Sequence, residues 1–158
     1  VRMEGLSLVH AALLGGGLLA MALTGYLAFR SRRRKRVSHE MDEMEGYEFE
    51  YYCANLLENS GFDQVEVTKK SGDYGVDILA EKDGITYAIQ CKCYHSPIGI
   101  KAVQEAYAGR DYYDRMVGAV MTNQYFTSAA AEAAGKLRIL LWDRGYMESM
   151  AEEAGRPF

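Results

Sequence analysis

Residues 76–92 read VDILAEKDGITYAIQCK, two strand-like stretches separated by an Asp-Gly pair at 83–84. Such a pair is a strong signal for a two-residue hairpin turn, because both residues tolerate a positive φ. With this turn, the numbers of any two facing residues add up to 167, so Asp77 faces Gln90. Side chains alternate along a strand, so Lys92 lies on the same face as Gln90. The other face of the hairpin is apolar and carries Val76, Ile78, Ala80, Ile89 and Cys91.

An unpaired carboxylate or ammonium group is costly to desolvate. The three polar side chains in the predicted sheet are therefore expected to pair with one another or to bind a ligand. One explanation is a metal site, because the carboxylate of Asp77 and the amide oxygen of Gln90 are hard ligands suited to Mg²⁺. Lys92 would then orient a water molecule and offset charge that develops on a phosphate. The other explanation is a structural ion pair between Asp77 and Lys92. Spacing alone leaves both explanations open.

A magnesium site needs a second carboxylate, and Glu50 is the best candidate. Residues 41–60 carry apolar side chains at helical spacing, which predicts an amphipathic helix. At 100° per residue, Glu48 would point about 200° away from Glu50 around this helix. We therefore expect Glu50 alone to join the hairpin residues.

The chain after residue 40 predicts an α/β sandwich with a mixed sheet covered by helices. Stretches of apolar or alternating residues predict strands, and stretches with helical periodicity lie between them. Gly61 is expected to end the first helix, and Thr127 to cap a later one. The order α-β-β-β-α-β-α-β, followed by a short terminal helix, is typical of this architecture. The expected strands cover 65–68, 76–80, 86–92, 117–121 and 139–142, and the later helices cover 100–114, 128–137 and 145–154.

The N-terminal part has a different character. Residues 6–29 carry no formal charge, and a helix of that length measures about 36 Å, enough to span a bilayer. Six of the seven residues 30–36 are arginine or lysine, which favours the cytoplasmic side for that end and places the N-terminus outside. A cleaved signal peptide would be basic before its apolar stretch, not after it. The sequence predicts a transmembrane helix at 6–29, a basic cytoplasmic linker at 30–40 and a cytoplasmic domain at 41–158.

Charge is divided sharply along the chain. Residues 37–158 contain eleven lysine and arginine residues against twenty-one aspartate and glutamate residues, a formal charge of −10. Proteins that bind nucleic acid usually gain much of their affinity by neutralising phosphates, so this acidity is unusual for a protein of that kind.

The three cysteines, Cys53, Cys91 and Cys93, are an odd number, which favours free thiols on the cytoplasmic side. Cys91, Cys93 and His95 do not have the spacing of a closed four-ligand zinc site.

Three segments together resemble the catalytic domain of the Mrr-like restriction endonucleases, in the PD-(D/E)xK nuclease superfold. They are GYEFE at 46–50, SGDYGVDI at 71–78 and AIQCKCY at 88–94, and the resemblance extends over roughly residues 45–145. Shorter matches are Ala102-Val103-Gln104-Glu105, Thr122-Asn123, Phe126-Thr127 and Leu141-Trp142-Asp143.

This resemblance implies roles for individual residues. Asp77 matches the metal-binding acid, Gln90 stands at the acid position of (D/E)xK, Lys92 matches the motif lysine and Glu50 the helix acid. The backbone carbonyl of Cys91 is expected to reach the metal as well. Gln104 and Asp73 are weaker candidates for contact with DNA.

The same resemblance implies hydrolysis of DNA phosphodiester bonds with Mg²⁺, for which Mn²⁺ would substitute, in type IV restriction of modified or foreign DNA. The expected partners are DNA and the lipid bilayer, and a small domain that cuts both strands would need a homodimer. The alternative is a membrane-tethered nucleic-acid-binding or interaction module without useful cleavage, which the negative charge favours. The presence of all four expected site residues weakens that alternative. RNA or a branched DNA junction is a third substrate that the motif does not exclude.

Overall fold

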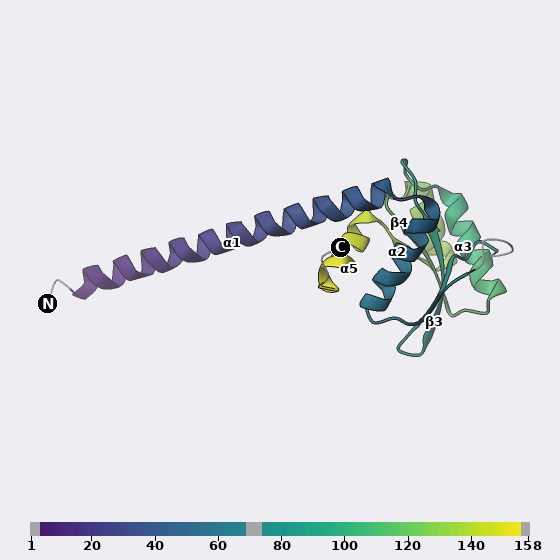
Figure 1. Cartoon of the computed structure of the whole chain (residues 1–158), viewed down its shortest axis with the longest axis horizontal. Coiled ribbons are helices and arrows are strands. Elements are labelled where there is room, and N and C mark those ends of the chain that lie inside the picture. Colours follow the sequence, from purple (N-terminus) through teal and green to yellow (C-terminus); the bar gives the residue numbers. More distant parts are fainter. Residues whose placement is uncertain (1–3, 69–73, 156–158) are drawn as a thin grey trace. The chain divides into compact units, whose positions relative to one another are not determined.

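The computed structural model describes residues 4–68 and 74–155, with side chains from residue 16 onward. The chain divides into an N-terminal unit, residues 1–36, and a second unit, residues 37–158, here called the sheet domain. Helix α1 runs over Glu4–Glu43, so the basic residues 30–40, expected as a linker, are helical. Figure 1 labels the elements along the chain.

Among the residues described with side chains, no helix is both long and apolar enough to cross a membrane. The predicted span at 6–29 begins among residues whose side chains lie outside that description.

A five-stranded mixed sheet forms the centre of the sheet domain, as the sequence predicts. Its strand order is β1-β2-β3-β4-β5. The first three strands pair antiparallel, and β3, β4 and β5 pair parallel. The strands are β1 (Asp63–Val67), β2 (Ile78–Lys82), β3 (Ile85–Lys92), β4 (Val117–Thr122) and β5 (Ile139–Trp142).

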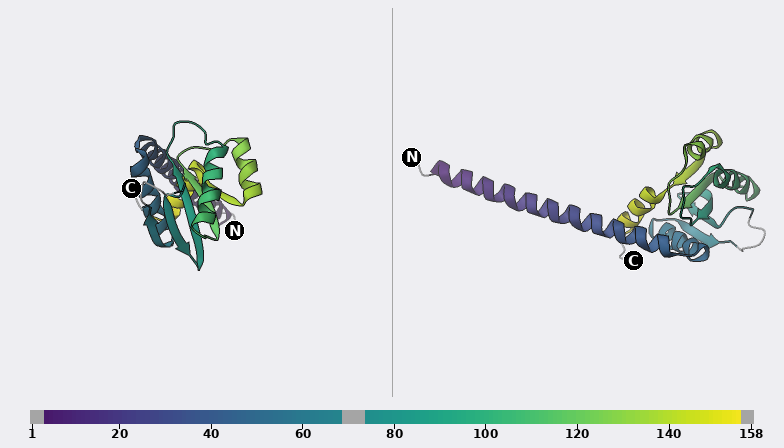
Figure 2. Two further views of the ribbon diagram at one scale, coloured as in Figure 1. Left: turned by 90° about the vertical axis from the view of Figure 1, so that its right-hand side faces the viewer. Right: turned by 90° about the horizontal axis from the view of Figure 1, so that it is seen from above.

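Helices cover both faces of this sheet, with α2 on one side and α3 and α4 on the other (Figure 2). One core packs the end of α1, α2 and α5 against the strands, and the other packs α3 and α4. These helices are α2 (Gly46–Asn59), α3 (Ile100–Tyr112), α4 (Ser128–Leu137) and α5 (Arg144–Glu153).

The β2–β3 hairpin has the register that the Asp-Gly turn predicts. Asp83 and Gly84 have φ angles of 53° and 76°, and Lys82 pairs with Ile85. The register continues to Ile78 and Ile89, whose numbers add up to 167. Strand β2 begins two residues later than expected, although the segment before it stays attached because the Asp77 N–H donates to the Ile89 carbonyl at 2.8 Å.

The helix expected at 41–60 is two helices. Helix α1 ends at Glu43 and α2 begins at Gly46, a residue with low helix propensity. The Glu48 side chain accepts a hydrogen bond from the Glu45 N–H at 3.1 Å, which caps the new start. The other expected helix ends hold: Gly61 has a φ of 82°, and the Thr127 hydroxyl accepts from the Ala130 N–H at 3.2 Å.

We predict that Gly109→Ala destabilises the sheet domain. A Cβ at Gly109, in α3, would lie 2.3 Å from Cγ2 of Val76 and 3.0 Å from the Tyr74 carbonyl oxygen. Such overpacking costs about 1–3 kcal/mol. Urea unfolding followed by the fluorescence of the single tryptophan, Trp142, measures the change.

Gly135→Ala in α4 is the matched control, because a Cβ there meets nothing within 4 Å. Alanine should stabilise this helix by up to about 1 kcal/mol. Equal unfolding midpoints for the two variants would contradict the close packing of α3.

Candidate active site

A pocket of about 660 Å³ lies where the start of α2, the end of β3 and the middle of α3 meet. It is the place where the expected site residues come together. Asp73 lies outside the described residues, and every other expected residue lines this pocket: Glu50, Asp77, Gln90, Cys91, Lys92 and Gln104.

Asp77 is buried and held by hydrogen bonds from the facing strand. Its Oδ2 accepts from the Cys91 N–H at 2.6 Å and from Nε2 of Gln90. Hydrogen bonds of this kind offset the cost of burying a carboxylate. The pairing of Asp77 with Gln90 that the hairpin register predicts is therefore present in the side chains as well.

Gln90 is 4% exposed, and its two amide atoms are in different situations. Nε2 donates to Asp77, whereas Oε1 is buried without a hydrogen-bond partner among the described residues. A buried acceptor without a partner is costly, so such an atom needs an explanation. Because Gln90 lines the pocket, a cation in the pocket would satisfy Oε1.

Gly75 shapes the wall beside this oxygen. Its φ is +80°, and a Cβ on it would lie 3.2 Å from Oε1 of Gln90 and 3.0 Å from Cβ of Glu105. Glycine therefore lets the loop before β2 pass between Gln90 and α3 without a clash.

Lys92 forms its ion pair with Glu105, not with Asp77 as the structural alternative proposed. Its Nζ lies 2.8 Å from Oε2 of Glu105. Burial lowers the pKa of Lys92, but the hydrogen bond to Glu105 and the charges of Glu105, Tyr94 and Asp77 outweigh it, so its pKa is raised. The lysine is therefore a cation at neutral pH.

The partnership with Glu105 was not predicted from the sequence. One signal was available, since Glu105 lies four residues after Lys101 on a helix, and its Oε1 is 3.7 Å from Nζ of Lys101. That spacing marks a helix face with paired charges, but it does not show that the face turns toward β3.

Glu50 lines the pocket from α2, whereas Glu48 binds the backbone of Glu45 at the start of the same helix. The angular separation around the helix predicts this division. Two carboxylates, Asp77 and Glu50, thus reach one pocket from different elements.

Cys91 lines the pocket, and its N–H donates to Asp77, while the residue also belongs to the core that contains α2. Burial, followed by a hydrogen bond with Cys53, raises the pKa of the Cys91 thiol well above its ordinary value. This agrees with the apolar face predicted for it and with free thiols. Within the described residues, no group of three or more His, Cys, Asp and Glu side chains could hold a metal. The residues of the pocket that could supply oxygen ligands are Asp77 and Glu50, with the amide oxygen of Gln90 and the Cys91 carbonyl.

Three solved structures share this fold. A protein of unknown function, AF1548, is 27% identical, with a TM-score of 0.57, and the match covers 67% of this chain and 65% of that one. The DNA modification-dependent restriction endonuclease AspBHI is 16% identical, with a TM-score of 0.64 and coverage of 79% and 36%. The MspJI restriction endonuclease, in complex with a 27-mer oligonucleotide, is 14% identical, with a TM-score of 0.53 and coverage of 80% and 33%.

This chain therefore spans just under two thirds of AF1548 and about a third of each endonuclease. No curated protein matches it. The sequence model of the family Mrr_cat, described as restriction endonuclease, matches residues 41–151, most of the chain and nearly all of the sheet domain. The chain belongs to this restriction endonuclease family.

Proposed function

We propose that this protein is a metal-dependent endonuclease that hydrolyses DNA phosphodiester bonds in the restriction of modified or foreign DNA. The observation that carries the proposal is the buried pair of Asp77 and Gln90. Oε1 of Gln90 has no hydrogen-bond partner among the described residues, and Gln90 and Lys92 line the same pocket. Membership of the restriction endonuclease family supports the same reaction class.

The donor atoms in the pocket fit a hard divalent cation. Asp77, Glu50, Oε1 of Gln90 and the Cys91 carbonyl would hold it through oxygen alone, which suits Mg²⁺ or Mn²⁺ better than a softer metal. The two carboxylates supply negative charge, and Gln90 supplies a neutral oxygen at the position where an acid stands in other branches of the superfold.

In the proposed hydrolysis, the metal ion and Lys92 would have different roles. A bound Mg²⁺ would polarise the phosphate and lower the pKa of a water molecule. Lys92, charged and fixed by Glu105, would stabilise the negative charge that builds up on the phosphate oxygens. Fixing the ammonium group beforehand reduces the reorganisation needed during the reaction.

The biological substrate is proposed from the neighbours' own descriptions. AspBHI is described as dependent on DNA modification, and MspJI was solved with an oligonucleotide. Both are much longer than this chain, so modification dependence of the type IV kind is a proposal for this protein.

The cleavage test uses plasmid DNA with Mg²⁺ or Mn²⁺, with EDTA as the metal-free arm. Asp77→Asn should reduce the rate by at least about 100-fold, because it removes the carboxylate charge while keeping the shape of the side chain. Lys92→Met should reduce the rate to the same extent, because it removes the ammonium group that would stabilise the charge on the phosphate.

Asp114→Asn and Lys136→Met are the matched controls, because neither residue lines the pocket. Both should cleave like the wild type. Cleavage by the two site variants at the control rate would sink the proposal, as would a folded wild type that is inactive with both metals.

We also propose that residues 6–29 anchor the protein in the cytoplasmic membrane, with the basic residues 30–36 on the cytoplasmic side. The support is the uncharged stretch followed by six cations. A span would place the nuclease near the membrane without changing its chemistry.

Fractionation of cells tests this anchor. The full chain should stay in the membrane fraction after a high-salt wash, since salt screens interactions between charges but does not weaken the burial of apolar side chains. A variant with Leu18→Arg and Leu19→Arg should move to the soluble fraction, because each central arginine costs about 2.5–3.5 kcal/mol. Recovery of the unaltered chain wholly as soluble protein would refute the anchor.

A further inference from the structure

Tyr94 is an exposed aromatic residue at the edge of the candidate site. It lies two residues after Lys92, lines the same pocket and is 51% exposed. An exposed ring on a fixed backbone is well suited to binding. Little conformational entropy is lost when such an aromatic ring stacks on a planar ligand.

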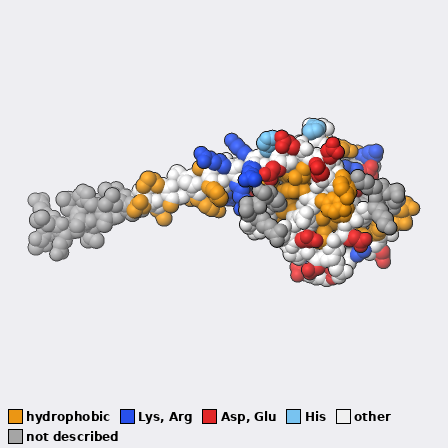
Figure 3. Space-filling model, viewed as in Figure 1, with side chains coloured by type: hydrophobic (Ala, Val, Ile, Leu, Met, Phe, Trp, Pro, Cys, Tyr) orange, Lys and Arg blue, Asp and Glu red, His pale blue; other side chains and the backbone are white. Residues whose placement is uncertain are grey.

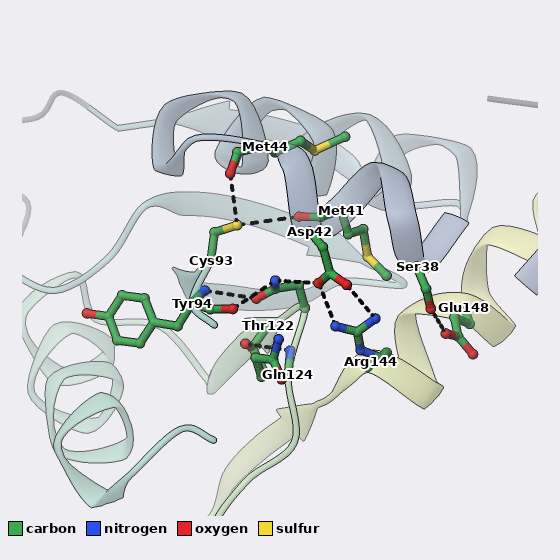
Figure 4. Close-up of polar contacts among 11 residues, drawn as sticks. Ser38, Met41, Asp42, Met44, Cys93, Tyr94, Thr122, Gln124, Arg144 and Glu148 are labelled. Atoms are coloured by element: carbon green, nitrogen blue, oxygen red, sulfur yellow. Dashed lines mark hydrogen bonds and ion pairs between the residues drawn. The ribbon is translucent and has the colours of Figure 1, made fainter. Parts of the chain in front are cut away.

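The backbone of Tyr94 is fixed at both of its polar groups by one buried side chain. The Tyr94 N–H donates to Oδ1 of Asn123 at 2.9 Å, and Nδ2 of Asn123 donates to the Tyr94 carbonyl at 3.0 Å. Asn123 is 0% exposed and follows directly after β4. Figure 4 shows the Tyr94 ring pointing away from these contacts.

A second set of contacts holds the side chain of Asn123 in place. Nδ2 of Asn123 also donates to Oδ1 of Asp42 at 3.0 Å, and Asp42 accepts two hydrogen bonds from the Arg144 guanidinium, at 2.5 and 3.1 Å. The preceding residue is tied as well, since Sγ of Cys93 lies 3.3 Å from the Met44 carbonyl oxygen (Figure 4). The fold thus fixes this part of the chain while leaving the ring exposed.

Another aromatic surface borders the same pocket. Tyr74 lines it, is 56% exposed and stacks on Tyr112, with ring centroids 3.7 Å apart and an interplanar angle of 21°. Aromatic residues from two separate segments, the loop before β2 and the segment just after β3, therefore border the pocket.

The charges around the pocket do not suit an intact duplex. The sheet domain carries a formal charge of −10, and Figure 3 shows acidic side chains spread around one of its faces. Among the described residues that line the pocket, the cations are Lys92 and Lys101. Lys92 is paired with Glu105, and Lys101, which is highly exposed, lies 3.7 Å from the same glutamate. Duplex and single-stranded DNA both present phosphates, whose neutralisation this surface supports poorly, but a single strand also exposes the faces of its bases.

An unpaired base has exposed faces on which the tyrosine rings at the pocket can stack. Its flat face stacks on an aromatic side chain with little dependence on sequence, and such stacking does not need a cation. In a duplex the base faces are covered by their neighbours. We propose that Tyr94 stacks on an unpaired base next to the scissile phosphate, so that single-stranded DNA is the preferred substrate. This inference rests on the proposed nuclease function and narrows its substrate class.

The test measures binding apart from cleavage. A fluorescein-labelled 20-nucleotide DNA, single-stranded or paired with its complement, is titrated with the full chain in detergent, with Ca²⁺ in place of Mg²⁺. The single strand should bind at least about 10-fold more tightly than the duplex. Tyr94→Ala should weaken single-strand binding by about 5- to 150-fold, the range that corresponds to one stacked base. Tyr94→Phe, which keeps the ring, should retain wild-type binding.

Tyr146→Ala is the matched control, because Tyr146 is 48% exposed and lines a different pocket. Its single-strand binding should equal that of the wild type. The proposal is overturned if the duplex binds as tightly as the single strand, if Tyr94→Ala loses no more than Tyr146→Ala, or if Tyr94→Phe binds as weakly as Tyr94→Ala. A protein that prefers single strands but never cleaves would contradict the nuclease proposal alone.

Discussion

The buried carboxylate of Asp77 is the constraint on which the rest of the site depends. It is acceptable in the sheet because the Cys91 N–H and the Gln90 side chain donate to it from the facing strand. The bond from Gln90 leaves Nε2 of its amide satisfied, whereas Oε1 has no hydrogen-bond partner in the described part of the chain. Side chains alternate along β3. With Gln90 facing Asp77, Lys92 therefore lies on the pocket face and Cys91 belongs to the core.

Much of this arrangement could be predicted from local chemistry. The Asp-Gly turn determines the hairpin register, and alternation then places Asp77, Gln90 and Lys92 on one face. Helical geometry separates Glu50 from Glu48 in the same way. What could not be predicted depends on distant segments. The ion pair of Lys92 with Glu105 requires α3 to cross the end of β3 closely, and that approach depends on Gly75 and Gly109, whose contacts are tertiary. The break between α1 and α2 was missed because the apolar spacing continues across it.

The acidity of the sheet domain and its exposed tyrosines have one physical explanation. A surface with few available cations cannot rely on phosphate neutralisation, and its affinity must then come from contacts that do not need positive charge. The rings of Tyr74 and Tyr94, which line the pocket, offer such contacts, and the two hydrogen bonds with Asn123 fix the backbone of Tyr94. Cleavage of a single strand would also need one site only, so a homodimer would not be required.

The central claim is that oxygen atoms of Asp77, Glu50 and Gln90 hold a divalent cation. A titration of the ¹⁵N-labelled protein with Mn²⁺, followed by the side-chain amide resonances in NMR, tests it most directly, because Mn²⁺ broadens signals from nearby nuclei. The account predicts that the Gln90 amide signal broadens at low Mn²⁺ concentration, that excess Mg²⁺ restores it, and that the effect is lost in Asp77→Asn. A Gln90 signal that broadens no more than that of Gln64, which lies outside the pocket, would contradict it.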